Sequence, residues 1–310
     1  CPLRVSLFGG STDNPNFVEK YGYGSVISFA SNLKTYITLH KDKLGYNVDA
    51  GKYIINYSRR EEVNSIKNIT NDPVRSVFEH FNLEPLSVSL NSDAYSQGSG
   101  LASSSSYIIS LIKAISLFKN LDLTPIEICN LAYQLELKFN PYCGYQDPYG
   151  CGIGGLKRIE FFKNNIIKYD FLETKLFDFF DAHLVFTGIT RNSKSILADV
   201  SKNIKKTKPL LETLEKAYFE FKNNNYENFL ELINQSWIQK KNTSNFISSN
   251  VTINKMDKEF TQNNTVIAHK LCGAGNGGFF LVFSERNKLK IPYNKVKIGV
   301  NTIGVRGNIL

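Results

Sequence analysis

The sequence predicts an α+β fold in two lobes, with the boundary between them near residues 170 to 185. The first half of the chain mixes strand and helix patterns in an order that does not repeat, whereas residues 193 to 260 are mostly helical. No repeat of fixed period and no long low-complexity linker divides the chain. At 310 residues it is long enough for one large domain or two modest ones, with a real core in either case.

Strand patterns are clearest in three places. Residues 86 to 93 (LSVSLNSD) alternate apolar and polar side chains, as a half-buried strand does, and residues 34 to 41 (KTYITLHK) also predict a strand. Residues 154 to 172 predict two strands that are joined by a turn at Asn164 and Asn165.

Helix patterns come with their own start signals. Residues 72 to 82 (DPVRSVFEHFN) predict a helix with Asp72 as its N-cap and Pro73 at its first position. Residues 124 to 139 begin with the sequence TPIE, which predicts a capping box. In the last third of the chain, the clearest helical pattern covers residues 208 to 241.

Composition and charge exclude several classes of protein. The chain is 42% hydrophobic and 21% charged, contains no run of eighteen apolar residues and shows no signal-peptide pattern, so we expect a cytoplasmic protein without a membrane partner. The net charge of +9 comes from lysines that are spread along the chain without interleaved aromatic residues. Such a pattern indicates a solvated surface or an anionic metabolite, and no nucleic-acid partner.

The five cysteines, Cys1, Cys129, Cys143, Cys151 and Cys272, are odd in number and include no Cys-x-x-Cys pair. We therefore expect reduced thiols and no structural zinc.

The segment SQGSGLASSSSY (residues 96 to 107) is rich in glycine and serine, which is typical of a flexible linker. However, a predicted strand precedes it, and an apolar run long enough for a buried helix, residues 107 to 120, comes after it. A strand, a Gly/Ser loop and then a helix form a phosphate-site layout, because the free amides and the dipole at the start of a helix favour an anion. Neither a Walker pattern nor a dinucleotide fingerprint is present, so the residues alone leave both interpretations open.

Glu136 lies after Ala132 and Cys129 at steps of four and three residues within its predicted helix, on an apolar stripe. Its carboxylate is therefore predicted to face inward, where it would need a cation, a hydrogen-bond network or a metal. An exposed glutamate at a frayed helix end is the alternative.

Two aspartates lie in loops. Asp147 stands before Pro148 in CGYQDPYGCGIGGL, where it could form a turn or orient a substrate hydroxyl during phosphoryl transfer. Asp13 comes after the apolar strand of PLRVSLFGGSTD, where it could hold sugar hydroxyls or form an Asx-turn.

Four loops become informative through their order along the chain: PLRVSLFGGSTD, GSGLASSSS, GYQDPYGCGIGGL preceded by Glu136, and CGAGNGGFF. Together they resemble the GHMP superfamily of small-molecule kinases, and more closely its branch of heptose phosphate kinases and fucokinases. The resemblance spans nearly the whole chain and includes FTGITRNSKSIL (residues 186 to 197) and SWIQKK (residues 236 to 241). The galactokinase signature is missing, and Arg4 with GGSTD occupies its place, which argues against a galactokinase.

The resemblance implies the two-lobed GHMP fold, with residues 1–178 as the N-terminal domain, residues 179–310 as the C-terminal domain, and ATP and sugar between the lobes. It implies ATP and Mg²⁺ as cofactors, with Ser104 and Glu136 binding the metal and Asp147 acting on the sugar hydroxyl. The implied nucleotide-phosphate loop is Gly98, Ser99, Gly100, Leu101, Ala102, Ser103 and Ser104. The implied substrate-binding residues are Arg4, Gly10, Asp13, Gly144, Gln146, Arg191, Gly273 and Gly275, of which the last two belong to a third motif that packs against the phosphate loop.

Two positions depart from the pattern of the family. Ala102 replaces the middle glycine of Gly-Leu-Gly-Ser-Ser, which we expect to be tolerated only if this residue has a negative φ. Asn276 interrupts the glycines of the third motif.

We therefore expect a sugar kinase that phosphorylates the anomeric hydroxyl of D-glycero-D-manno-heptose 7-phosphate, giving the 1,7-bisphosphate for nucleotide-activated heptose synthesis. Arg4, Arg191, Lys240 and Lys241 stand in or beside the motifs and could clamp the phosphate already on the substrate. Alternatively, Arg191 only caps a loop, and the two lysines form a solvated helix face, which is the commoner state of such lysines. A kinase for an unphosphorylated, fucose-like sugar and a non-catalytic sugar- or nucleotide-binding regulator are the alternatives. The expected partner is a small-molecule sugar or sugar phosphate, and the sequence leaves the oligomeric state open.

Overall fold

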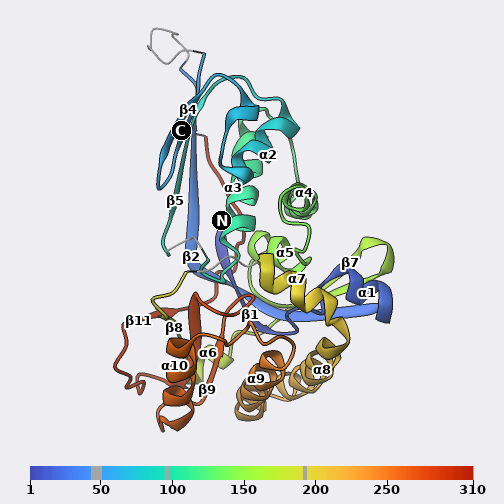
Figure 1. The fold of residues 1–310 in the computed structure, drawn as a ribbon, viewed down its shortest axis with the longest axis vertical. Helices are drawn as coiled ribbons and strands as arrows, with labels where there is room; N and C mark the ends of the chain where they lie inside the picture. Colours follow the sequence, from blue (N-terminus) through green and yellow to red (C-terminus); the bar gives the residue numbers. More distant parts are fainter. Residues whose placement is uncertain (43–50, 95–97, 191–193, 310) are drawn as a thin grey trace.

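The computed structural model describes residues 1–42, 51–94, 98–190 and 194–309. Within these residues, two β-sheets form the frame of the molecule and helices pack against them (Figure 1). The first sheet has seven strands, in the order β4-β3-β5-β2-β6-β7 with β1 paired to β2, and the second has four, in the order β11-β8-β10-β9. The predicted α+β class is therefore confirmed.

The strands of the first sheet are β1 (Pro2–Phe8), β2 (Tyr23–His40), β3 (Tyr53–Asn56), β4 (Arg60–Val63), β5 (Ser87–Ser92), β6 (Leu156–Phe162) and β7 (Ile166–Leu172). Those of the second are β8 (Phe180–Phe186), β9 (Ala268–Leu271), β10 (Phe279–Glu285) and β11 (Lys295–Ile298).

The helices are α1 (Pro15–Tyr21), α2 (Asp72–Phe81), α3 (Ser103–Phe118), α4 (Pro125–Leu137), α5 (Gln146–Gly152), α6 (Leu176–Phe179), α7 (Lys194–Lys202), α8 (Lys208–Lys222), α9 (Tyr226–Lys241) and α10 (Val251–Gln262). In the parts of the chain that the structure describes, no helix is long and apolar enough to cross a membrane.

Strand β2 is much longer than the pattern of residues 34 to 41 predicts. It has 18 residues, pairs with β6 along its first part and with β5 along its second, and so runs through the centre of the first sheet. Residues 24 to 31 are all buried, so they show no alternation of apolar and polar side chains. The absence of that alternation explains why the sequence pattern missed the first part of β2.

Local start and turn signals agree with the structure, with one correction. The capping box at the start of α4 is present, and Asn164 and Asn165 turn between β6 and β7 with φ of 61° and 57°. The N-cap of α2, however, is Asn71 and not Asp72: the Asn71 side chain accepts a 3.1 Å hydrogen bond from the amide of Val74. Asparagine and aspartate are both good N-caps, so two adjacent candidates could not be ranked from the sequence.

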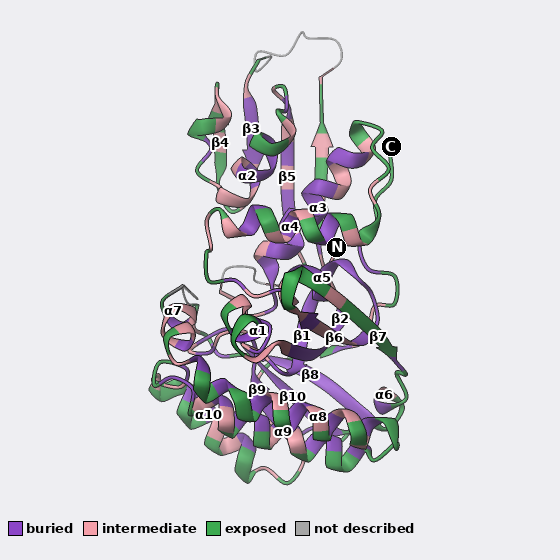
Figure 2. Ribbon diagram, turned by 90° about the vertical axis from the view of Figure 1, so that its right-hand side faces the viewer, coloured by how far each residue is buried: buried purple, intermediate pink, exposed green. Residues whose placement is uncertain are grey.

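One hydrophobic core lies between the two sheets. It joins Leu7 of β1 and Phe29 of β2 to Leu214 of α8, Phe229 of α9 and Leu281 of β10. All five side chains are fully buried, and Figure 2 shows buried residues on the strands and helices of this part of the molecule. Residues from the two ends of the chain therefore share one core.

The C-terminal segment returns from β11 to the first sheet. Val300 bridges to Ser31, and the amide of Asn301 donates a 2.7 Å hydrogen bond to the carbonyl of Ala30. The amide of Val305 bonds to the carbonyl of Gly152 at the end of α5 over 3.1 Å. The last described residues thus pack against elements from the beginning and the middle of the chain.

Candidate active site

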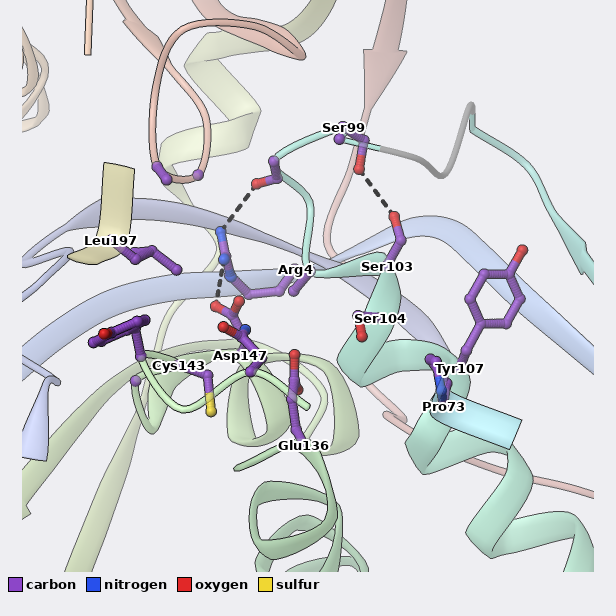
Figure 3. Close-up of a pocket in the computed structure, with 18 of the residues that line it drawn as sticks. Arg4, Pro73, Ser99, Ser103, Ser104, Tyr107, Glu136, Cys143, Asp147 and Leu197 are labelled. Carbon is purple, nitrogen blue, oxygen red and sulfur yellow. Dashed lines mark hydrogen bonds and ion pairs between the residues drawn. The ribbon is translucent and has the colours of Figure 1, made fainter. Parts of the chain in front are cut away.

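A cleft of about 970 Å³ is lined by residues from both sheets and brings together segments that are far apart in the sequence (Figure 3). Most of the predicted site residues line it: Arg4, Gly10, Asp13, Gly98, Ser99, Gly100, Ala102, Ser103, Ser104, Glu136, Gly144, Gln146, Asp147 and Gly273.

Three predicted site residues do not appear in the lining. The side chain of Leu101 is fully buried in the core between the sheets. Gly275 belongs to the loop between β9 and β10, where an added Cβ would come within 2.7 Å of the side chain of Ile247. Arg191 lies outside the described residues.

The loop before α3 has the backbone of an anion site. Positive φ angles at Gly98, Gly100 and Ala102 (68°, 78° and 60°) alternate with Ser99 and Leu101, which are not left-handed. Such alternation turns successive amide groups toward one concave side. The N-cap residue of α3 is Ala102, which offers no side-chain hydrogen bond, so amides of the first helical turn remain available for a ligand.

The expectation of a negative φ at Ala102 is wrong, since this residue adopts the left-handed conformation with φ 60° and ψ 39°. A left-handed alanine costs about 1–2 kcal/mol. The methyl group is buried in the apolar cluster that also contains Ile109 and Cys151, which offsets part of that cost.

The loop of residues 272–278 packs directly on this first loop. A Cβ added to Gly100 would lie 2.6 Å from the carbonyl oxygen of Cys272, and one added to Gly278 would overlap the carbonyl oxygen of Ser99. The amide of Phe279 also bonds to Ser99 O over 3.3 Å. Glycine is thus required in both loops because their backbones touch.

Asn276 fits this second loop without strain. Its φ is 55°, a conformation that asparagine adopts more readily than most residues. Its amide donates a 2.7 Å hydrogen bond to the carbonyl of Ile247, and its side chain accepts one from Ser249.

Serine side chains and Glu136 meet at the start of α3. The hydroxyls of Ser99 and Ser103 are 2.9 Å apart, and Ser105 donates a hydrogen bond to the Glu136 carboxylate. Glu136 is 3% exposed, so the predicted inward orientation is confirmed. Burial and the nearby charge of Asp147 raise the pKa of Glu136 to about 7, while hydrogen bonds from Ser105, Asn140 and Ser104 oppose that rise. Ser105 is a partner that the sequence did not single out.

Asp147 forms an ion pair with Arg4 in the cleft (Figure 3). Arg4 is 2% exposed and also donates a 3.3 Å hydrogen bond to the carbonyl of Gly100, so one guanidinium joins the first turn of α5 to the glycine loop. Gly150 allows this arrangement, because a Cβ there would overlap the side chain of Arg4.

Asp13 joins two loops at the edge of the cleft. Its carboxylate accepts 3.0 Å hydrogen bonds from the backbone amides of Ser11 and Gln146. A Cβ on Gly144 would overlap that carboxylate, so glycine is required there. Burial raises the pKa of Asp13 to about 6, against the effect of the Gln146 amide.

Several polar atoms at the cleft have no protein partner. Among the described residues, six buried side-chain atoms lack a hydrogen bond, and four of them belong to residues that line the cleft: Arg4 Nε, Ser6 Oγ, Asn140 Oδ1 and Gln146 Oε1. Unpaired buried polar atoms are costly, so these four are the polar groups of the cleft residues that a bound ligand or water could satisfy.

Of the four basic residues that could clamp a substrate phosphate, Arg191 lies outside the described residues, and the other three have different partners. Arg4 is paired with Asp147, and Lys240 is 9% exposed, lines the cleft and donates to the carbonyl of Gly273. Lys241 is not part of the lining and forms a 2.6 Å ion pair with Asp257 instead. The solvated-face interpretation is therefore wrong for Lys240.

The cleft also contains residues that the sequence analysis missed. Lys270 of β9 lines it close to Arg4, and its position two residues before Cys272 and the third motif was the available signal. Another part of the lining is formed by Tyr57, Arg59, Pro73 and Tyr107, which come from separate segments without a shared motif. Only the packing of α2 and α3 against the first sheet reveals them.

Comparisons with known proteins agree with this architecture. Residues 68–155 match the family model of the GHMP kinases N terminal domain. The chain is 30% identical to D-glycero-alpha-D-manno-heptose 7-phosphate kinase of Campylobacter jejuni over 319 residues, covering 96% of this chain and 91% of that protein. It is 25% identical over 343 residues to L-fucokinase/L-fucose-1-P guanylyltransferase of Bacteroides fragilis, covering 95% of this chain and 35% of that protein. The crystal structure of a D-glycero-D-manno-heptose 1-phosphate kinase from Bacteroides thetaiotaomicron superposes with a TM-score of 0.74 at 19% identity, covering 98% of this chain and 95% of that one.

Proposed function

Because the chain belongs to the GHMP kinases, which are phosphotransferases that act on hydroxyl groups, we propose that it transfers the γ-phosphate of ATP to a sugar. The proposed acceptor is the anomeric hydroxyl of D-glycero-D-manno-heptose 7-phosphate, and the product is the 1,7-bisphosphate. The name of the relative that is 30% identical supports this choice of substrate.

The observation that carries the proposal of a sugar is the set of unpartnered polar atoms at the cleft. Arg4 Nε is a donor, Asn140 Oδ1 and Gln146 Oε1 are acceptors, and the Ser6 hydroxyl is both. A polyol carries hydroxyls that donate and accept within a few ångströms of one another. A cleft whose lining residues carry both unpaired donors and unpaired acceptors therefore suits a sugar.

Asp147 is the proposed catalytic residue. In phosphoryl transfer, the protein mainly positions the reactants and stabilises charge, and an aspartate orients or deprotonates the attacking hydroxyl. The ion pair with Arg4 holds the Asp147 carboxylate in one orientation. The loop of residues 98–104 would bind the ATP phosphates through its amides and hydroxyls.

The residues near the start of α3 fit a magnesium ion. Glu136 is buried and forms no ion pair with any described residue, and the hydroxyl of Ser104 lies beside it, so hard oxygen donors without a cation are present. No described cluster of three or more His, Cys, Asp or Glu side chains would hold a metal alone. We propose that Ser104 and Glu136 hold Mg²⁺ together with nucleotide phosphates, and that the ion neutralises phosphate charge.

Lys240 is the proposed contact for the phosphate that the substrate already carries. It is a buried cation at the cleft, and a phosphate offers it charge-assisted hydrogen bonds. The competing acceptor is a free, fucose-like sugar, which the similarity to the fucokinase of Bacteroides fragilis supports.

The test is a comparison of kcat/KM, measured through ADP release, on the heptose 7-phosphate, free heptose, mannose and fucose. We expect the heptose 7-phosphate to be preferred over free heptose, and Lys240→Met to reduce that preference by about 10- to 100-fold. Lys241→Met is the matched control, since Lys241 pairs with Asp257 outside the cleft, and it should leave the preference unchanged. A preference for a free sugar would reject the heptose phosphate and the phosphate contact, but not a sugar kinase.

A further inference from the structure

Lys270 is a buried cation whose role none of the motifs explains. It lies in β9 of the second sheet, is 4% exposed and lines the cleft. Its Nζ donates a 2.7 Å hydrogen bond to the carbonyl oxygen of Leu7 in β1 of the first sheet. The ammonium group therefore sits where the two sheets meet at the cleft.

The charge of Lys270 is not balanced by a carboxylate. Within the described residues it forms no ion pair, whereas the neighbouring Arg4 is paired with Asp147. An ammonium group has three N–H donors, and the contact with Leu7 uses one of them. A buried cation with spare donors at the wall of a cleft is suited to bind an anion.

We propose that Lys270 binds the phosphoryl group in transit, donating hydrogen bonds to its non-bridging oxygens. This inference rests on the phosphoryl transfer and on the role of Asp147 proposed above, and it does not depend on which sugar is the acceptor.

The cleft could hold two phosphates near Lys270: the phosphoryl group in transit and the phosphate already on the heptose. The position of Lys270 relative to Arg4 favours the first. Lys270 bonds to Leu7 of β1, the strand that also carries Arg4. Arg4 pairs with Asp147, and all three charged residues line the cleft, so Lys270 lies on the side where Asp147 would orient the hydroxyl. In the transfer, the bond from phosphorus to the bridging oxygen of ADP breaks, a bond to the sugar oxygen forms, and Asp147 takes the hydroxyl proton. The phosphate on carbon 7 of a heptose lies at the far end of the sugar from this reaction.

Binding of a phosphate would change the protonation of Lys270. The pKa of Lys270 is lowered to about 8, chiefly by burial; Cys272, two residues along the chain, opposes this shift, and Arg4 of β1 adds to it. An anion against the ammonium favours the charged form, so the pKa rises when the phosphate binds. At pH 8.5, complex formation should therefore take up protons from solution.

The first experiment measures nucleotide binding without sugar, by calorimetry with Mg²⁺ and either ADP or the non-hydrolysable β,γ-imido analogue of ATP. For Lys270→Met, we expect affinity for the analogue to fall roughly 10- to 100-fold and affinity for ADP to stay within about twofold. Lys270→Arg should recover part of the loss, because it keeps the charge. Lys241→Met serves as the matched control and should bind both nucleotides as the wild type does.

The second experiment measures proton uptake, first in the wild type and then in Lys270→Arg. Titration of the wild type at pH 8.5 in buffers of different ionisation enthalpy should show proton uptake with the analogue and none with ADP. Lys270→Arg should abolish this uptake, since arginine stays protonated, and a purely structural lysine would not produce it.

Two outcomes would overturn the proposal. If Lys270→Met binds both nucleotides normally but loses the preference for sugar phosphate over free sugar, Lys270 holds the acceptor's own phosphate. If the wild type takes up no proton and Lys270→Met only lowers the melting temperature, the lysine is structural. Failure of the sugar panel alone would leave these nucleotide measurements intact.

Discussion

The two glycine-rich loops of the cleft, residues 98–102 and 272–278, look alike in sequence but lead into different kinds of secondary structure. The first continues into helix α3 and the second into strand β10. A helix start leaves amides and a positive dipole end free for an anion, whereas a strand commits its amides to neighbouring strands. Glycine content alone therefore does not identify a phosphate site, because in the second loop it serves close contact with the first.

The two loops also bring different charges into the cleft. Glu136 and Asp147 stand beside the first loop, and Lys240 and Lys270 accompany the second. We therefore expect the acid chemistry and the metal beside the first loop, whose amides would also bind the nucleotide phosphates, and the lysine contacts to phosphate beside the second. Substitutions beside the first loop, compared with matched substitutions elsewhere, test this difference between the loops.

The largest effect is expected for Asp147→Asn, which removes the proposed acid beside the first loop. Turnover should fall by about 100- to 10,000-fold while ATP still binds. The matched change on the second loop is Asn276→Gly, which keeps the left-handed backbone and should leave turnover within about twofold. Steady-state kinetics with calorimetric ATP binding measure both, and similar losses in the two variants would break the comparison.

Gly278→Ala should break the contact that the two loops share. The added Cβ would overlap the carbonyl oxygen of Ser99, and the residue has a φ of 89°, so overpacking and backbone strain together cost about 2–5 kcal/mol. The free energy of unfolding, measured by chemical denaturation, should fall by this amount, and the KM for ATP should change as well. Gly22→Ala is the control, because Gly22 has a φ of 78° with no atom within 4 Å of an added Cβ. It should lose only about 1 kcal/mol of stability and no activity.

Glu136→Gln should raise the magnesium requirement and slow the reaction roughly tenfold or more, because an amide oxygen is a weaker ligand for Mg²⁺ than a carboxylate. Ser104→Ala should act in the same direction with little loss of stability. A magnesium titration of the initial rate measures both effects. If Glu136→Gln shows the wild-type magnesium curve, the metal is not held beside the first loop.

Ala102→Gly is expected to have the smallest effect. Glycine removes the left-handed strain, which stabilises the protein. It also loses the buried methyl group and gives the unfolded chain more freedom, and both changes destabilise the protein. These contributions nearly cancel, so the free energy of unfolding should change by less than about 1 kcal/mol. If φ at this position were negative, the same change would cost about 1.5 kcal/mol. Thermal unfolding distinguishes the two values and so checks the backbone shape of the first loop.

Features set by neighbours along the chain were determined by the sequence. The capping box of α4, the Asn164–Asn165 turn and the order of strand, glycine loop and helix around residues 86 to 118 all result from short-range hydrogen bonds and backbone preferences. The inward orientation of Glu136 could be predicted in the same way from helical periodicity. The third motif and the acidic loops could be placed in the site only through the family resemblance.

Tertiary packing decided the rest. The first part of β2 is buried on both faces, so its burial left no alternating pattern to read. The left-handed Ala102, the overlap of glycines between the two loops and the contact of Lys270 with Leu7 all depend on backbone segments that approach from distant parts of the chain. A single sequence records which residues are present at such contacts. It does not record which distant carbonyl or charge stands opposite them, and that opposing group sets the strain, the burial and the pKa.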